Sequence, residues 1–331
     1  MGSHIISSLT HKISVVFPGQ ASQYVGMSKT LVEQFPWTQD IYEEASDAIK
    51  ENVFKLCTEG PEDALQLTKN QQPCILVTSF AWFQVLRKTF DFTPFAGGGH
   101  SLGEYSALLA SGAMTLSEAL RLVRTRGELM QNAVPQGKGK MAAVLGLSDD
   151  KVKELCQKAT HNNDTSFVVP ANFNAPSQVV VAGHAEAVDR AQAIASDPNS
   201  GELKARKFIP LNVSAPFHSP LMKPVAQQFT SHLQAVKWQK RSFPVVHNVD
   251  AQIRTEGDLI PLLTQQLDHP VLWTSCVASL VQHGTTTFVE MGPNKVLTGL
   301  IKRISDNVKL FSMDSIDDLK KFETYLKEGQ S

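Results

Sequence analysis

Residues 99–103 (Gly-His-Ser-Leu-Gly) stand between a short apolar stretch and a helical pattern, and this arrangement constrains the fold more than any other feature. The stretch at 95–99 predicts a buried strand, and 102–111 predicts a helix. Two glycines allow the sharp bend that a strand-to-helix turn needs. Such a turn exposes Ser101 at a helix N-terminus, where the amide of Leu102 and the helix dipole favour negative charge. Ser101 is therefore a candidate nucleophile; the alternative is a serine that only caps the helix.

Strands and helices alternate along the first part of the chain. Residues 13–17 (ISVVF) predict a buried strand that runs into a turn at Pro18-Gly19. Helical stretches follow, including one at 73–89 and one at 116–134. This alternation is typical of a mostly parallel sheet that is covered by helices. We therefore expect a large α/β-hydrolase-like domain.

The pattern changes after a linker at 135–140 (PQGKGK). A strand, a helix, two strands, a helix and a last strand are predicted at 141–147, 149–160, 166–173, 178–182, 185–195 and 205–211. This β-α-β-β-α-β order is that of a small ferredoxin-like unit. We therefore expect a small ferredoxin-like domain at 137–212, inserted into a large α/β domain that comprises 12–136 and 213–331.

A serine becomes a good nucleophile only when a base takes its proton, and ten histidines compete for that role. His218 lies in a segment (SAPFHSP, 214–220) that two prolines stiffen, just after the predicted small domain. A stiff loop at this point can present an imidazole to Ser101; the alternative is a packed or surface histidine. His4 and His11 are expected in a tail, His161 and His184 at the surface of the small domain, and His232, His247, His269 and His283 have no partner motif.

Arg126 lies on the apolar side of the helix predicted at 116–134, because its neighbours at helical spacing are leucine, valine and methionine. A buried guanidinium needs an anionic or hydrogen-bonding partner, since a lone buried charge costs several kcal/mol. One interpretation is a structural salt bridge to a core Asp or Glu. The other is a bidentate contact with a substrate carboxylate. Helix geometry does not choose between them.

The composition excludes several classes of protein. A formal net charge of −1 gives no overall attraction to nucleic acid or to an anionic membrane. The longest apolar stretch is too short to span a bilayer, and nothing at the start of the chain is typical of a secretory signal. The four cysteines are far apart and form no CxxC pair, so we expect buried free thiols and a cytoplasmic protein.

Six segments, in order, resemble malonyl-CoA:acyl carrier protein transacylases. They are residues 17–27, 99–108, 174–180, 214–220, Gln266 with Pro270 and Trp273, and 290–300. The resemblance covers nearly the whole chain, from residue 17 to about 304. It implies an acyltransferase of fatty acid biosynthesis that carries a malonyl group from malonyl-CoA to the phosphopantetheine thiol of acyl carrier protein.

The resemblance also implies a role for each matching residue. Ser101 would carry the malonyl group, and His218 would be its base. The amides of Gln20 and Leu102 would form the oxyanion hole. Arg126 would bind the malonyl carboxylate, and Gln266 would orient His218. No metal or bound cofactor is implied, and we expect a monomer that interacts with neither nucleic acid nor a membrane.

The sequence departs from the family pattern at three places and leaves two rivals open. Ser177 and Asn294 replace usual glycines, although Asn tolerates a positive φ, and the glycines at 97–99 predict a flexible strand. One rival is a hydrolase with the same serine and histidine, which would have no reason to bury Arg126. The other is a non-catalytic scaffold that binds acyl carrier proteins.

Overall fold

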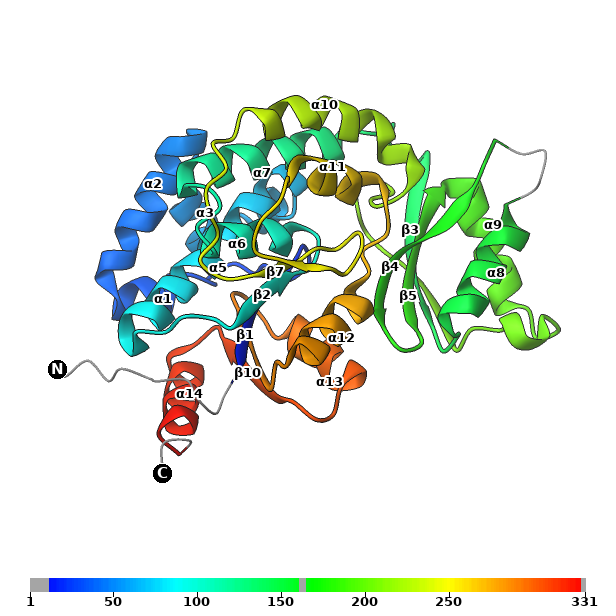
Figure 1. Ribbon diagram of the computed structural model, residues 1–331. Coiled ribbons are helices and arrows are strands. Elements are labelled where there is room, and N and C mark those ends of the chain that lie inside the picture. Colours follow the sequence, from blue (N-terminus) through cyan, green and yellow to red (C-terminus); the bar gives the residue numbers. More distant parts are fainter. Residues whose placement is uncertain (1–11, 161–164, 329–331) are drawn as a thin grey trace.

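The computed structural model describes residues 12–160 and 165–328. The expectations for His4, His11 and His161 lie outside these residues. A six-stranded sheet, with the order β10-β9-β1-β2-β7-β8, forms the centre of the molecule (Figure 1). Its strands are β1 (Ile13–Phe17), β2 (Ala96–Gly99), β7 (Val245–Val246), β8 (Ile253–Arg254), β9 (Thr287–Met291) and β10 (Lys309–Met313). All neighbouring pairs are parallel except β7 with β8. The mostly parallel sheet of the predicted large domain is confirmed.

Helices cover both faces of this sheet. Side chains alternate along β1, so Val15 and Phe17 join one apolar core while Val16 joins another on the opposite face. Helices that contribute to the first core include α1 (Lys29–Gln34), α2 (Gln39–Ile49), α3 (Val53–Glu59), α4 (Glu62–Leu65), α5 (Thr68–Phe90), α6 (Leu102–Ala110), α7 (Leu116–Gln131), α10 (Lys223–Gln234), α11 (Ile260–Asp268) and α14 (Ile316–Glu328). The second core lies under α12 (Trp273–His283) and α13 (Val296–Ile304). No helix within the described ranges is both long and apolar enough to cross a membrane.

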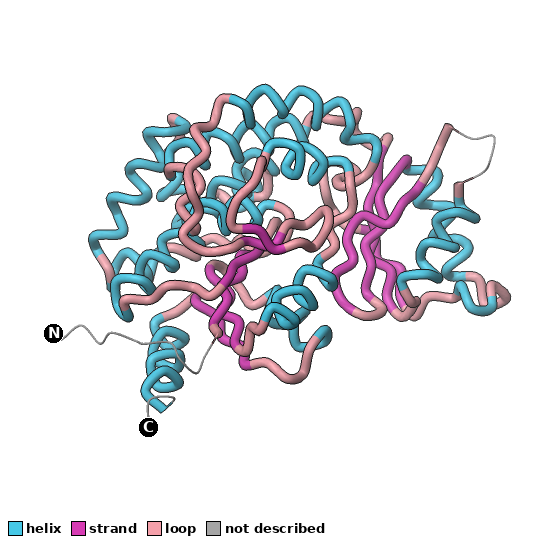
Figure 2. The backbone as a smooth tube through the Cα atoms, viewed as in Figure 1, coloured by secondary structure: helices cyan, strands magenta, loops and turns pink. Residues whose placement is uncertain are grey.

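A separate four-stranded antiparallel sheet lies beside the large one (Figure 2). Its order is β4-β5-β3-β6, formed by β3 (Gly139–Leu145), β4 (Val168–Ala175), β5 (Gln178–His184) and β6 (Lys207–Pro210). Helices α8 (Asp149–Ala159) and α9 (Ala185–Ser196) pack on one face. The ferredoxin-like arrangement is confirmed, and we propose 137–212 as the limits of this domain. Short 3-10 helices occur at Pro36–Thr38, Gly201–Leu203 and Pro220–Met222.

The second face of the small sheet packs against the large domain. Ala142 and Val144 of β3 face α8 and α9, whereas Met141 belongs to the large core. Strand β4 also pairs with the large domain, because the amide of Phe173 donates to the carbonyl of Val271 at 2.9 Å. The small sheet is therefore held in one position against the large domain, beside the residues that follow β2.

Candidate active site

Ser101 occupies a strained turn between β2 and α6. Its φ of 51° and ψ of −103° are unusual for a residue with a side chain and cost on the order of 1–3 kcal/mol. The flanking glycines allow this turn, since a Cβ on Gly99 would lie 2.0 Å from the Gly103 main chain. The Ser101 side chain makes no capping hydrogen bond to α6, so the alternative of a simple helix cap is wrong.

The glycines of β2 serve close packing. A Cβ on Gly97 would lie 2.7 Å from the Phe243 ring, and one on Gly98 would lie 2.6 Å from Val246. The sequence predicted a flexible strand here, whereas in the structure these glycines allow close packing. Their missing side chains let β2 lie deep in the core and bring Ser101 to the end of the sheet.

His218 lies beside Ser101. Its Nε2 is 2.8 Å from Ser101 Oγ, and its Nδ1 is 2.8 Å from the main-chain oxygen of Gln266. A carbonyl oxygen only accepts, so Nδ1 carries the proton and Nε2 is free to accept one from the serine. Burial, with a smaller effect of the Arg126 charge, lowers the pKa of His218 from 6.5 to about 3. The imidazole is thus neutral and able to act as a base.

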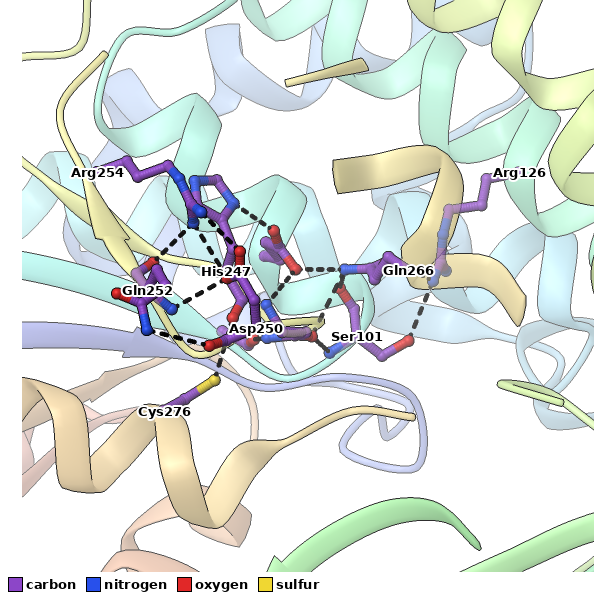
Figure 3. Close-up of polar contacts among 11 residues, drawn as sticks. Ser101, Arg126, His247, Asp250, Gln252, Arg254, Gln266 and Cys276 are labelled. Carbon is purple, nitrogen blue, oxygen red and sulfur yellow. Dashed lines mark hydrogen bonds and ion pairs between the residues drawn. The ribbon is translucent and has the colours of Figure 1, made fainter. Parts of the chain in front are cut away.

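Gln266 contacts both residues of this pair. It was expected to orient His218, and its main-chain oxygen accepts from Nδ1 of His218. The side-chain oxygen accepts from Arg126 Nη2 at 3.0 Å, and the side-chain nitrogen donates to the main-chain oxygen of Ser101 at 2.9 Å. Figure 3 shows Gln266 between Ser101 and Arg126. One residue therefore contacts the nucleophile, the candidate base and the buried cation.

Arg126 is completely buried beside the nucleophile. Its Nη2 donates to Ser101 Oγ at 3.0 Å, its Nη1 donates to Gln72 Oε1 at 2.9 Å, and its guanidinium lies 5.0 Å from the ring centre of Tyr105. Among the residues that the structure describes, none is a hydrogen-bond partner of Nε. Within the described residues Arg126 forms no ion pair with an Asp or Glu, so the structural salt bridge expected as one interpretation is absent. The desolvation caused by burial lowers the pKa of this guanidinium.

Gln20 and Leu102 lie at the same end of the central sheet. Gln20 follows β1, and Leu102 is the first residue of α6. The two segments are in close contact, since a Cβ on Gly19 would lie 2.6 Å from the main-chain oxygen of His100. The Gln20 side chain donates to Gln71 Oε1 at 2.6 Å. The oxyanion-hole role of the two amides stays a prediction.

Several polar residues of this region were not identified from the sequence. Gln72 contacts Arg126 because α5 begins at Thr68, five residues before the expected start at Pro73. His247 was described as lacking a partner motif, but its Nδ1 is 2.7 Å from Glu104 Oε1. One signal was present in the sequence, because Glu104 is the single charged residue of α6.

The comparisons with known proteins agree with this geometry. A family model described as an acyl transferase domain matches residues 15–321. A malonyl CoA-acyl carrier protein transacylase of Bacillus subtilis (strain 168) is 39% identical over 318 residues, which cover 96% of this chain and 98% of that protein. The chain belongs to this transacylase family.

Other members of the transacylase family give the same result. The malonyl CoA-acyl carrier protein transacylase of Escherichia coli (strain K12) is 41% identical and covers 90% of this chain and 94% of its own. The crystal structure of malonyl-CoA:acyl carrier protein transacylase from Xanthomonas oryzae pv. oryzae has a TM-score of 0.89 at 40% identity, over 95% of this chain and 98% of that one. A malonyl-transacylase solved in complex with a type II PKS acyl-carrier protein has a TM-score of 0.88 at 37% identity, over 94% and 98%.

Both departures from the family's glycines occur at turns with a positive φ. Asn294 has φ 66°, and its side chain donates to the main-chain oxygen of Ser22 at 2.7 Å. Ser177, between β4 and β5, has φ 59°. Asn294 thus adopts the positive φ that asparagine was expected to tolerate.

Proposed function

We propose that this chain transfers the malonyl group of malonyl-CoA to the phosphopantetheine thiol of acyl carrier protein, in support of fatty acid synthesis. The observation that carries this proposal is the buried guanidinium of Arg126, 3.0 Å from Ser101 Oγ and without an acidic partner within the described residues. A fully buried cation favours an anion as its partner. A malonyl thioester brings a carboxylate at a short, fixed distance from the carbonyl carbon that Ser101 attacks.

The first half of the cycle forms a malonyl-serine ester. Ser101 gives its proton to Nε2 of His218 while Oγ bonds to the thioester carbonyl carbon. The amides of Gln20 and Leu102 stabilise the oxyanion of this tetrahedral intermediate. The carbon–sulfur bond then breaks, and the departing coenzyme A thiolate takes the proton from His218. The carboxylate of the ester stays paired with Arg126.

The second half reverses this order with another thiol. His218 takes the proton of the phosphopantetheine thiol, and the sulfur bonds to the ester carbonyl carbon. The bond from carbon to Ser101 Oγ breaks, and the serine regains its proton from His218. The cycle uses Ser101, His218, Arg126 and the two main-chain amides in both halves, and it needs neither a metal ion nor a bound cofactor, because the acyl group arrives as a thioester.

An approach route for the two thiols lies beside His218. A cavity of about 610 Å³ is formed by Val169, Pro170 and Phe173 of β4 on one side and by His218 and Pro270, with other residues, on the other. Its mostly apolar walls suit the pantetheine arm that coenzyme A and the carrier protein share. We propose that both arms enter here, between the two sheets.

Further properties of the enzyme complete the proposal. The partners are malonyl-CoA and acyl carrier protein, and the related malonyl-transacylase solved with a carrier protein supports the second. We propose a monomer that acts in the cytoplasm without binding nucleic acid or a membrane. All four cysteines are buried free thiols, as expected, and this suits a reducing compartment.

Brief exposure of the purified chain to malonyl-CoA tests the proposal. We expect intact-mass and peptide-mass measurements to find a malonyl adduct on Ser101, which disappears when acyl carrier protein is added. Absence of the adduct would favour the scaffold. Continued release of coenzyme A without carrier protein would favour the hydrolase. A Ser101→Ala variant provides the control for nonspecific modification.

A further inference from the structure

A buried polar cluster lies behind Ser101, and no step of the proposed cycle uses it (Figure 3). Its members are Glu104 of α6, His247 and Asn248 after β7, and Gln266 of α11. Each of these side chains is at most 1% exposed. Buried polar groups are costly unless they are paired, so a cluster of this size at the nucleophile calls for a physical reason.

The Glu104 carboxylate is the centre of the cluster. Its Oε1 is 2.7 Å from Nδ1 of His247. Its Oε2 accepts from Nε2 of Gln266 at 2.7 Å and from the main-chain amide of Asn248 at 3.2 Å. A carboxylate only accepts, so these contacts fix the positions of Asn248 and Gln266 and place the His247 proton on Nδ1.

Two of these partners hold the main chain of the nucleophile. The amide of Ser101 donates to Oδ1 of Asn248 at 2.8 Å, and Nε2 of Gln266 donates to the main-chain oxygen of Ser101 at 2.9 Å. Asn248 is also fixed by its Nδ2, which donates to the main-chain oxygen of Gly99 at 2.8 Å. A strained residue persists only where its surroundings over-determine its conformation. For Ser101, both peptide groups are held by residues that Glu104 holds.

Glu104 also determines which way the Gln266 amide points. The nitrogen must face the carboxylate of Glu104, and the oxygen must face Arg126, because a guanidinium only donates. The main-chain oxygen of Gln266 meanwhile orients His218. A rotation of this amide would turn its nitrogen towards the guanidinium and break the contact with Ser101.

We infer that Glu104 is a positioning residue for acyl transfer. It touches neither substrate nor the reacting atoms, and it acts through Asn248 and Gln266 on Ser101 and on the base. Its contribution is to hold the nucleophile in a conformation that the turn would otherwise leave. The inference rests on the proposed function only in taking Ser101 as the nucleophile.

Three variants test this role. Glu104→Ala removes the carboxylate. Glu104→Gln retains the contacts, since the new amide oxygen can accept from Asn248 and Gln266 while the new nitrogen donates to the other tautomer of His247. Glu290→Gln is the matched control, because Glu290 of β9 is an equally buried side chain whose carboxyl oxygens accept from the main-chain amides of Leu297 and Thr298 in the first turn of α13.

The measurement is the rate at which Ser101 is acylated, by malonyl-CoA and by p-nitrophenyl acetate, with the melting temperature recorded for each variant. We expect Glu104→Ala to slow acylation by both on the order of 100-fold, since two peptide contacts are loosened, with the loss in kcat and not in KM. Glu104→Gln should stay within about tenfold of the unmodified chain, and Glu290→Gln within about twofold.

The following results would contradict the inference on Glu104 or the proposed function. A folded Glu104→Ala variant that acylates within about threefold of the unmodified chain overturns the inference. So does a Glu104→Gln variant as slow as Glu104→Ala, because charge and not position would then be needed. If Glu104→Ala does not fold, Asn248→Ala replaces it, and an unchanged rate there overturns the inference. An unmodified chain that reacts with p-nitrophenyl acetate but not with malonyl-CoA contradicts the proposed function alone.

Discussion

The small sheet and the region around Ser101 are each stabilised by a different kind of contact. The small sheet with α8 and α9 encloses a core made almost entirely of aliphatic side chains, such as Val144 and Val181. The region around Ser101 is held instead by buried hydrogen bonds between side chains that are far apart in the sequence, such as Glu104 and His247. Packing tolerates small shifts, whereas hydrogen bonds fix atoms to a few tenths of an ångström. The difference suits a site that must hold a strained nucleophile.

The largest expected effect comes from the buried cation of the polar region. We expect Arg126→Ala to lower malonyl transfer by roughly 10²–10³-fold, because a desolvated contact between a guanidinium and a carboxylate is worth about 3–4 kcal/mol. Acetyl transfer has no carboxylate to lose and should fall by less than about tenfold. The measurement is kcat/KM with malonyl-CoA and with acetyl-CoA.

Arg124 offers a matched control for this variant. It lies on the same helix, α7, but pairs with Glu51 and Glu128 near the surface. Arg124→Ala should leave both activities within about twofold, since exposed ion pairs contribute little. Equal losses of malonyl and acetyl transfer in Arg126→Ala would instead make Arg126 a structural residue.

The regular strands and helices of the fold could be predicted from the sequence, because their apolar residues recur at a regular spacing. The sequence located the strands and helices of the small sheet, and the spacing of apolar neighbours placed Arg126 inside. The contacts around Ser101 leave no such pattern. Glu104 and His247 are separated by 143 residues, and only the fold brings them together. A proline at the expected start of α5 likewise concealed Gln72, which the helix carries to Arg126.

The next expected effect concerns the pH dependence of the base. Because the pKa of His218 is lowered to about 3, its imidazole stays neutral at pH 5. We expect kcat/KM for acylation by p-nitrophenyl acetate, a neutral ester, to change by less than about threefold between pH 5 and pH 7.5. A histidine with the ordinary pKa near 6.5 would lose about 30-fold at pH 5. A titration step near pH 6.5 would contradict the burial of this base.

The lowered pKa of His218 also makes the folded chain less stable as the pH falls. The unfolded chain takes up a proton on His218 near pH 6.5, and the folded chain does so only near pH 3. The contribution of the neutral, buried imidazole is therefore present above about pH 6.5 and is lost as the pH falls towards 3. Unfolding by denaturant at several pH values measures it, and His218→Ala should show a weaker dependence over this window.

The smallest effect on acylation is expected for a substitution in the small sheet, because it changes only side-chain packing. Val181 of β5 is completely buried in the core under α8 and α9. Val181→Ala should lower the free energy of unfolding by about 1–3 kcal/mol through the lost methyl groups and the cavity they leave. Acylation of Ser101 should stay within about twofold, because the polar contacts that hold the nucleophile do not pass through this core. Val213→Ala, at a 39% exposed valine, is the control and should change neither quantity. A loss of acylation that follows the loss of stability would show that the small sheet positions Ser101 as well, through β4 and the contact of Asn174 with His100 at 2.8 Å.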